Sequence, residues 1–260
     1  MENYISALFI GQDEIAPEMD MTAFERIFGE AARITEEQVP VESPATARQE
    51  KEEIRDVSIR YLTKLHAEFS REDCPWHVLA CELGFGMKGQ PAFGRDYEYI
   101  GCEESEDNED YEEIRYHDLW HLFFRGKIDR LDGYVDAQGK QHYRIIDYKT
   151  GSYENFVKYK LDPPGGKMQT LQHHIYQMFM SEKGQVDSFS YIFPFEEREE
   201  EREIKIREFC DPMHENDDYI LQVLHLLFAK GYFPAMTKIG GCAYCDYSDI
   251  CISKILMPEE

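Results

Sequence analysis

The sequence predicts an α/β or α+β fold, and two observations support this. Segments with helical periodicity alternate with short strand-like runs, and a hairpin candidate lies near the middle of the chain. Hydrophobic residues make up 42% and aromatic residues 13% of the 260 residues, which is enough apolar material for a sizeable core. Because no linker interrupts the elements, we expect a single domain over residues 1–260.

The first part of the chain predicts two helices and a strand. A helix is expected over residues 22–32, and a longer one over residues 45–69, where charges fill the face opposite an apolar stripe. The members of that stripe recur at steps of three or four positions: Ile54, Val57, Tyr61, Leu65 and Phe69. Residues 76–85 follow as a strand that ends in a glycine-rich segment.

The remainder of the chain mixes strands and helices. Residues 117–135 and 142–149 are strand-like and are joined across a short segment that contains Gly139, as in a hairpin. After the break at residues 163–166 (Pro-Pro-Gly-Gly), we expect a helix over residues 168–183 and strands over residues 187–195 and 204–209. A last helix is expected over residues 217–230, ahead of a cysteine-rich segment.

The charge balance restricts the partners of the chain. It contains 28 Lys and Arg against 52 Asp and Glu, a formal net charge of −24. Free-standing binders of duplex DNA usually carry a basic stripe, so a nucleic-acid role must depend on a local site, bound cations or a basic partner. No apolar run approaches the ~20 residues of a membrane span, and the N-terminus lacks a cationic leader. We therefore expect a soluble, cytoplasmic protein without a membrane partner.

Two aspartates in the hairpin are the most informative residues. Asp129, in Gly126-x-x-Asp129, and Asp147 lie equally far from Gln138, so a symmetric hairpin places them opposite each other. Two carboxylates with Cβ atoms about 4.5–5.5 Å apart repel each other unless a cation lies between them or one of them is protonated. Because Mg²⁺ prefers oxygen ligands of this kind, the register predicts a metal site.

Lys149 extends this candidate site. It shares the face of Asp147, because side chains alternate along a strand, and it could hold a water or neutralise charge on a phosphate. An ordinary exposed salt bridge is the alternative for this pair. Gln172 and Tyr176, four positions apart on the helix after the break, share one face and could hydrogen-bond to a phosphate. The alternative for them is a polar edge of a helix.

Together, these motifs resemble a known family. Gly126-x-x-Asp129, the Asp-Tyr-Lys-Thr-Gly run at 147–151 and Gln-x-x-x-Tyr at 172–176 are similar to the motifs of the PD-(D/E)XK nucleases, in the branch of the AddB- and RecB-type nuclease domains. The spacing Cys-x2-Cys-x5-Cys at 242–251 is most similar to the AddB-type iron–sulfur nucleases. The resemblance implies a restriction-endonuclease-like core, with a central mixed β-sheet flanked by helices.

The resemblance also implies metal-dependent hydrolysis of DNA phosphodiester bonds, at or near DNA ends. Asp129 and Asp147 would bind Mg²⁺ or Mn²⁺, and the carbonyl of Tyr148 would complete the site. Lys149 would assist the attacking water.

Three further residues take supporting roles by the same resemblance. Gln172 and Tyr176 would support the site and the DNA strand. Glu82, within a Glu-x-x-Phe-Gly stretch common in these domains, is a further candidate metal ligand, and a structural role at a sheet edge is the alternative.

The sequence departs from the family upstream of these motifs. Family members carry an earlier helix with a further metal ligand, often His, and a fourth cysteine ahead of it. No such helix is evident before Thr22, and His66 lies too late in the chain to be that ligand. The chain is therefore expected to begin inside the family domain.

The C-terminal cysteines form a candidate metal cluster. Cys242, Cys245 and Cys251 lie close together, and soft thiolates suit a [4Fe–4S] cluster or Zn²⁺. Such a centre needs one more ligand. The sequence leaves four candidates for it: Cys74, Cys81, Cys102 and Cys210. Three unligated cysteines are the alternative.

Three functions compete at this point. The first is a metal-dependent DNA exonuclease, acting alone or as a module of a recombination or repair helicase–nuclease with a helicase subunit as partner. The second is a catalytically inactive structural or DNA-guiding subunit that retains the nuclease fold. The third, a zinc-stabilised interaction module, makes no use of the acidic hairpin.

Overall fold

The computed structural model describes residues 1–12, 14–38, 43–103, 114–161, 170 and 172–206. Two compact units are distinguished: residues 1–96 with 121–210, and residues 97–120 with 211–260. That they form a single domain stays the prediction made from the sequence. Among the described residues, no helix has both the length and the apolar character needed to cross a membrane.

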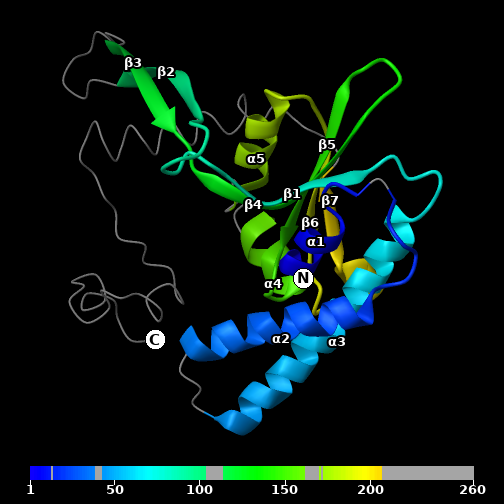
Figure 1. Cartoon of the computed structure of the whole chain (residues 1–260). Coiled ribbons are helices and arrows are strands. Elements are labelled where there is room, and N and C mark those ends of the chain that lie inside the picture. The colour runs from blue at the N-terminus through cyan, green and yellow to red at the C-terminus, as the bar shows by residue number, and fades with distance from the viewer. Residues whose placement is uncertain (13, 39–42, 104–113, 162–169, 171, 207–260) are drawn as a thin grey trace, which may run out of the picture. The chain divides into compact units, whose positions relative to one another are not determined.

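The first unit is built on a mixed five-stranded sheet (Figure 1). The strand order is β1 (His77–Phe85), β4 (Gly126–Val135), β5 (Gln141–Tyr148), β6 (Gln185–Ile192) and β7 (Glu203–Ile206). β5 and β6 run parallel, and the other neighbours run antiparallel. With helices packed on it, this mixed sheet confirms the α/β class predicted from the sequence.

The β4–β5 hairpin has the predicted register. Its paired residues run from Val135↔Gln141 to Arg130↔Ile146, which is symmetric about Gln138. The strand expected over residues 117–135 is wrong, because that stretch contains β3 (Ile114–Phe123) and β4. β3 pairs with β2 (Gly94–Glu103) in a separate two-stranded sheet. The chain changes sheets where the Phe124 N–H donates to the Phe93 carbonyl, and the apolar run around it hides this break.

Both predicted N-terminal helices are present. α2 spans Met21–Gln38 and α3 spans Pro44–Phe69. Ser43 caps α3 by accepting a hydrogen bond from the Thr46 N–H, and proline at the first helical position suits this start. Short helical segments follow the hairpin: α4 (Tyr153–Phe156), a π-helical turn (Val157–Leu161) and a 3₁₀ turn (Glu199–Glu201).

α5 (Gln172–Ser181) is shorter than the helix expected over residues 168–183. Thr170 is not helical, and its hydroxyl accepts a hydrogen bond from the Gln172 N–H. Of that predicted segment, residues 168, 169 and 171 lie outside the described residues, as does the helix expected over residues 217–230.

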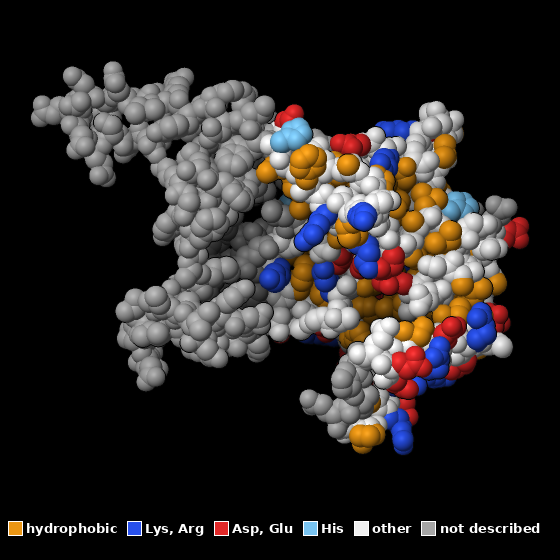
Figure 2. All heavy atoms as spheres, turned by 60° about the vertical axis from the view of Figure 1, so that its left-hand side comes forward, with side chains coloured by type: hydrophobic (Ala, Val, Ile, Leu, Met, Phe, Trp, Pro, Cys, Tyr) orange, Lys and Arg blue, Asp and Glu red, His pale blue; other side chains and the backbone are white. Residues whose placement is uncertain are grey.

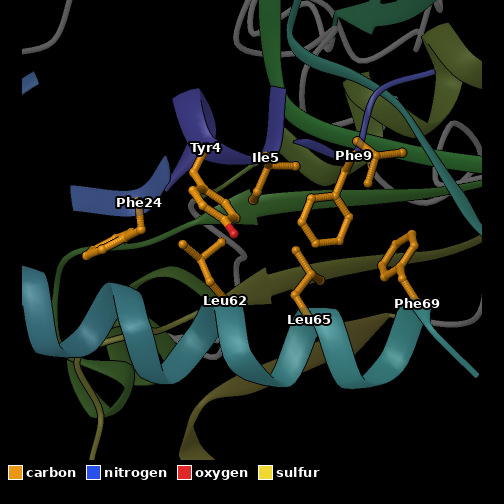
Figure 3. Close-up of a cluster of buried hydrophobic side chains, with 8 residues drawn as sticks. Tyr4, Ile5, Phe9, Phe24, Leu62, Leu65 and Phe69 are labelled. Carbon is orange, nitrogen blue, oxygen red and sulfur yellow. The ribbon is translucent and has the colours of Figure 1, made fainter. Parts of the chain in front are cut away.

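A helix that the sequence did not predict, α1 (Glu2–Leu8), is anchored by a buried hydrophobic cluster. Figure 3 shows Tyr4 and Ile5 of α1 pointing toward Leu62 and Leu65 of α3. Tyr4 and Ile5 are 1% and 0% exposed, and fully burying such side chains contributes about 1.5–3 kcal/mol each. This packing holds α1 in place, so the position of Glu2 is fixed by the core.

Candidate active site at the end of the β4–β5 hairpin

The backbone ladder between β4 and β5 stops just before the two predicted aspartates. Its last pair is Arg130↔Ile146. Beyond that pair, β4 continues against β1 as far as Gly126↔Phe85, and β5 continues against β6 as far as Tyr148↔Ile192. Asp129 and Asp147 are therefore the first residues of each strand past the point where the two strands part.

Asp129 bridges this parting with its side chain. Its Oδ2 accepts a hydrogen bond of 2.8 Å from the Tyr148 backbone N–H, which takes the place of a ladder bond. The register of β1 with β4 places Glu82 across from Asp129, since Cys81↔Arg130 and Leu83↔Ile128 flank them.

The side chains of Asp147, Lys149 and Gln172 form one connected group. Asp147 Oδ2 lies 2.6 Å from Lys149 Nζ, and its Oδ1 accepts a hydrogen bond of 2.5 Å from Gln172 Nε2. Lys149 Nζ also donates to Gln172 Oε1 at 2.7 Å. The ammonium lies 5.3 Å from the centre of the Tyr191 ring and 5.8 Å from that of Phe156, so aromatic faces help to hold it.

Tyr176 joins this group from the next turn of α5. Gln172 Nε2 donates to its hydroxyl at 3.2 Å, as expected for residues four apart on a helix. The hydroxyl also accepts a bond from the Lys127 backbone N–H at 3.4 Å, so Tyr176 connects α5 to β4. A Cβ atom at Gly126 would lie 2.6 Å from the rings of both Phe85 and Tyr176, which explains the glycine of the Gly-x-x-Asp motif.

A second acidic group lies around Asp129. Ligand oxygens of Glu2, Glu82 and Asp129 all lie within 4.8 Å of one another. Glu82 has a left-handed backbone with φ of 57°, a conformation that costs roughly 1–3 kcal/mol and clusters at functional sites. Lys127 forms an ion pair with Glu82. Asp147 does not belong to this trio, and its oxygens contact Lys149 and Gln172 instead.

Burial and mutual repulsion shift the pKa values of these acids. The pKa of Glu2 rises to about 7, chiefly through burial and then through the charges of Glu82 and Asp129. The pKa of Asp147 rises to about 6, again chiefly through burial, although Lys149 opposes the shift. Burial also raises the pKa of Asp129, while the Tyr148 N–H opposes it. The raised pKa values of Glu2, Asp129 and Asp147 mean that nearby positive charge does not fully compensate these carboxylates.

The donor set suits a divalent cation with a preference for oxygen. Three converging carboxylates that repel one another gain most from an ion between them, and Mg²⁺ and Mn²⁺ favour such ligands. Glu2, Glu82 and Asp129 would hold the ion, with Asp147 and the Tyr148 carbonyl next to Asp129 along the parting strands. The residues present therefore fit a magnesium or manganese site.

Glu2 is the residue that sequence reasoning missed. The expectation that no helix precedes Thr22 is wrong, because α1 brings Glu2 to Asp129. His66 is no ligand: its Nδ1 lies 2.7 Å from the Ala16 carbonyl and its Nε2 lies 3.1 Å from the Tyr4 hydroxyl, inside the core. The short α1 shows too little periodicity to be detected as a helix from the sequence.

The cysteine motif lies outside the described residues, since Cys242, Cys245 and Cys251 belong to residues 207–260. Of the candidates for a fourth ligand, Cys102 lies on β2, Cys210 lies outside the described residues, and Cys74 and Cys81 are free thiols with intermediate exposure. The cluster therefore stays a prediction.

Comparison with known proteins decides the family. The chain matches the family model of the PD-(D/E)XK nuclease superfamily over residues 11–252, which is most of its length. The chain belongs to the PD-(D/E)XK nuclease superfamily. No curated protein matches it.

Membership in the PD-(D/E)XK superfamily agrees with the architecture and the site chemistry. The mixed five-stranded sheet with its helices is the restriction-endonuclease-like core of this superfamily. Its members are metal-dependent nucleases that typically use Mg²⁺ or Mn²⁺, so DNA is the implied substrate. The acidic group at Asp129 and the Asp147–Lys149 pair lie at the motifs on which the predicted resemblance of this PD-(D/E)XK chain depends.

The raised pKa of Glu2 predicts an unusual effect of neutralising it. In the unfolded chain Glu2 ionises near pH 4.5, but in the folded protein it keeps its proton until about pH 7. Its contribution to stability is therefore present below pH 4.5 and lost as the pH rises through 7. In EDTA at pH 8, Glu2→Gln is expected to be more stable than the wild type by on the order of 2 kcal/mol, and this gain should vanish near pH 4.5.

Thermal unfolding with and without Mn²⁺ checks this prediction. Mn²⁺ should stabilise the wild type more than Glu2→Gln at pH 8, because the variant lacks one candidate ligand. Glu18→Gln, which removes an exposed carboxylate, is the matched control and should follow the wild type. A Glu2→Gln protein that is less stable than the wild type in EDTA at pH 8 would contradict the prediction.

Proposed function

We propose that this PD-(D/E)XK protein is a divalent-metal-dependent DNA exonuclease that hydrolyses phosphodiester bonds at or near DNA ends. The observation that carries the proposal is the meeting of two groups where β4 and β5 part: the carboxylates of Glu2, Glu82 and Asp129, and the Asp147–Lys149 pair. The three carboxylates can bind a metal cation. The Asp147–Lys149 pair places an ammonium group next to a carboxylate.

Each residue has a role in this proposal. A bound Mg²⁺ or Mn²⁺ would supply charge for the phosphate and lower the pKa of a water. Asp129 would hold the ion together with Glu2 and Glu82, and Asp147 and the Tyr148 carbonyl would complete its ligands. Lys149, kept in place by Asp147 and Gln172, would orient the attacking water or neutralise charge that develops on the phosphate.

Gln172 and Tyr176 would keep Asp147 and Lys149 in position and would bind the DNA strand. Gln172 connects Asp147, Lys149 and Tyr176 through its amide, so it can keep all three aligned. The Tyr176 hydroxyl bonds to the β4 backbone at Lys127. An amide and a hydroxyl at this position suit hydrogen bonds to phosphate oxygens.

DNA must approach a chain with a net charge of −24. Figure 2 shows several Lys and Arg side chains on one face, with acidic side chains among them. We propose that a partner such as a helicase subunit supplies the rest of the affinity, in a recombination or repair complex. The support for this partner, and for a cluster at Cys242, Cys245 and Cys251, is the resemblance of the motifs and the cysteine spacing.

A cytoplasmic location is part of the same proposal. The seven cysteines of the sequence are an odd number, and the described Cys74 and Cys81 are free thiols. Free thiols are typical of reducing compartments.

The inactive-subunit alternative loses its main support. It depended on the lack of an upstream helix with a further metal ligand, and α1 provides a helix with Glu2 beside Asp129. The catalytic reading is therefore the better one.

End-labelled linear duplex DNA and covalently closed circular DNA test the function directly. With Mg²⁺ or Mn²⁺ we expect the linear DNA to be shortened and the closed circle to survive, and with EDTA both should survive. Cleavage of the circle would show an endonuclease instead. Equal recovery of linear DNA with metal and with EDTA would contradict the nuclease proposal.

A further inference from the structure

Tyr148 is held from both faces of the sheet by two consecutive residues of β4. Asp129 accepts a hydrogen bond from its backbone N–H at 2.8 Å, and Arg130 Nη1 donates to its hydroxyl at 3.0 Å. Neighbouring residues on a strand project to opposite faces, so the two contacts grip Tyr148 from either side. Because the ladder ends at Arg130↔Ile146, these side-chain bonds are what joins β4 to β5 beside Asp147.

Helix α3 completes this arrangement, which we call the Tyr148 clamp: Asp129, Arg130, Tyr148 and Tyr61. Arg130 Nη1 donates to the Tyr61 hydroxyl at 2.8 Å, and the two tyrosine hydroxyls lie 3.1 Å apart. The two rings meet edge to face with centroids 5.5 Å apart. Burial raises the pKa of the Tyr148 hydroxyl well above its usual value, so the hydroxyl stays protonated.

Arg130 is fixed independently of the tyrosines. It is 3% exposed, its Nη2 donates to Asp132 Oδ2 at 3.1 Å, and its Nε lies 3.1 Å from Asp132 Oδ1. Asp132 also accepts a bond of 2.6 Å from Arg144 Nε, and Arg144 Nη1 donates to Glu68 at 2.6 Å. Removing one partner of a buried ion pair costs about 3–5 kcal/mol, so the network is better probed at its tyrosine neighbours than at Arg130 itself.

The clamp is adjacent to the residues that would hold the ion. Its Asp129 is a candidate ligand, and Tyr148 lies between Asp147 and Lys149 in the chain. A shift of Tyr148 therefore moves Asp147 and Lys149 relative to Asp129. The ion pairs of Asp132 with Arg130 and Arg144 connect β4 and β5 where the two strands are still paired, so they do not by themselves set the separation of Asp129 from residues 147–149.

We propose that Arg130 and Tyr61, acting through the Tyr148 side chain, fix the separation of Asp129 from residues 147–149 and thereby set the selectivity of the site for Mg²⁺ over Ca²⁺. The inference rests on the proposed function. Mg²⁺ requires near-ideal octahedral geometry at short distances, whereas Ca²⁺ accepts longer and more variable ones. A looser clamp therefore weakens Mg²⁺ binding more than Ca²⁺ binding. Arg130 and Tyr61 are positioning residues and touch no ion.

Two conservative variants test the clamp without disturbing the buried charges. Tyr148→Phe and Tyr61→Phe each remove one hydroxyl, and in each the Nη1 of Arg130 keeps the other hydroxyl as a partner. Tyr143→Phe is the matched control, because Tyr143 lies on the same strand and its hydroxyl makes no hydrogen bond within the described part of the chain.

Calorimetric titration of the full-length chain with Mg²⁺ and with Ca²⁺ gives the readout. Residues that support metal ligands typically change affinity by about 10–100-fold, so Tyr148→Phe should weaken Mg²⁺ binding about 10-fold or more, with a smaller loss for Ca²⁺. Tyr61→Phe should change the same ratio in the same direction by less. Tyr143→Phe should keep both wild-type constants.

The possible outcomes separate the clamp from the function. Unchanged Mg²⁺ binding in both tyrosine variants, with only a lower melting temperature, would show a purely structural role and overturn the clamp. Equal losses for Mg²⁺ and Ca²⁺ would overturn its role in selectivity. A wild type that binds neither ion would overturn the proposed metal site itself, and the clamp with it.

Discussion

Asp147→Asn should lower metal-dependent hydrolysis of linear DNA by about 10³-fold or more. A divalent ion stabilises the charge of the transition state by several kcal/mol, and the variant removes one of the carboxylates proposed to bind that ion. The asparagine keeps the shape of the side chain and can still contact Gln172. The pKa of Asp147 is raised mainly by burial, so removing its charge relieves an unfavourable burial. The variant should therefore lose activity without losing thermal stability in EDTA at neutral pH.

Initial rates with saturating Mn²⁺ check this result, and Asp129→Asn should behave alike. Asp187→Asn is the matched control, since Asp187 pairs with His142 away from the candidate site. It should keep wild-type activity. A rate for Asp147→Asn within a factor of about ten of the wild type would remove this residue from the mechanism.

Lys149→Met should reduce the rate by about 10²–10³-fold, the usual loss when one group that stabilises transition-state charge is removed. The ammonium contacts both Asp147 and Gln172, so its loss also leaves Asp147 without its positive neighbour. Lys149 holds the pKa of Asp147 down, and without it that pKa should rise above about 6. The acidic side of the pH–rate profile should consequently move to higher pH.

The pH dependence distinguishes this role from a merely structural one. Metal binding at pH 8 should persist in Lys149→Met, because no proposed ligand is removed. Lys64→Met, which removes an exposed lysine that pairs with Glu199, serves as the control and should leave rate and profile unchanged. An active Lys149→Met enzyme with the wild-type pH profile would exclude Lys149 from the reaction.

Local patterns predicted the parts of the fold that depend on local forces. The α3 stripe follows from periodicity and is confirmed in part: Val57, Leu65 and Phe69 are buried, but Ile54 is 46% exposed, and Leu62, which the stripe omitted, is buried instead. The register of β4 with β5 follows from side-chain alternation and a short turn, and the structure confirms it. The same register brought Asp129 and Asp147 to the end of the hairpin. It did not show that the ladder stops one pair earlier, because that depends on the pairing of β4 with β1 and of β5 with β6.

Long-range packing produced the features that the sequence did not predict. Glu2 reaches Asp129 because Tyr4 and Ile5 are buried against α3, and no pattern within α1 indicates this. From the sequence, Arg130 and Asp132 look like exposed charges on a strand. In the structure both are buried, and Tyr61 of α3 contacts Arg130. The division of residues 117–135 between two sheets was also missed, because it depends on which distant strands β3 and β4 pair with.

Anomalous diffraction from crystals grown with Mn²⁺ tests the central claim most directly. The account predicts an anomalous peak within bonding distance of an Asp129 carboxylate oxygen, with further oxygen ligands drawn from Glu2, Glu82, Asp147 and the Tyr148 carbonyl. A fully occupied peak elsewhere, with none at Asp129, would contradict it.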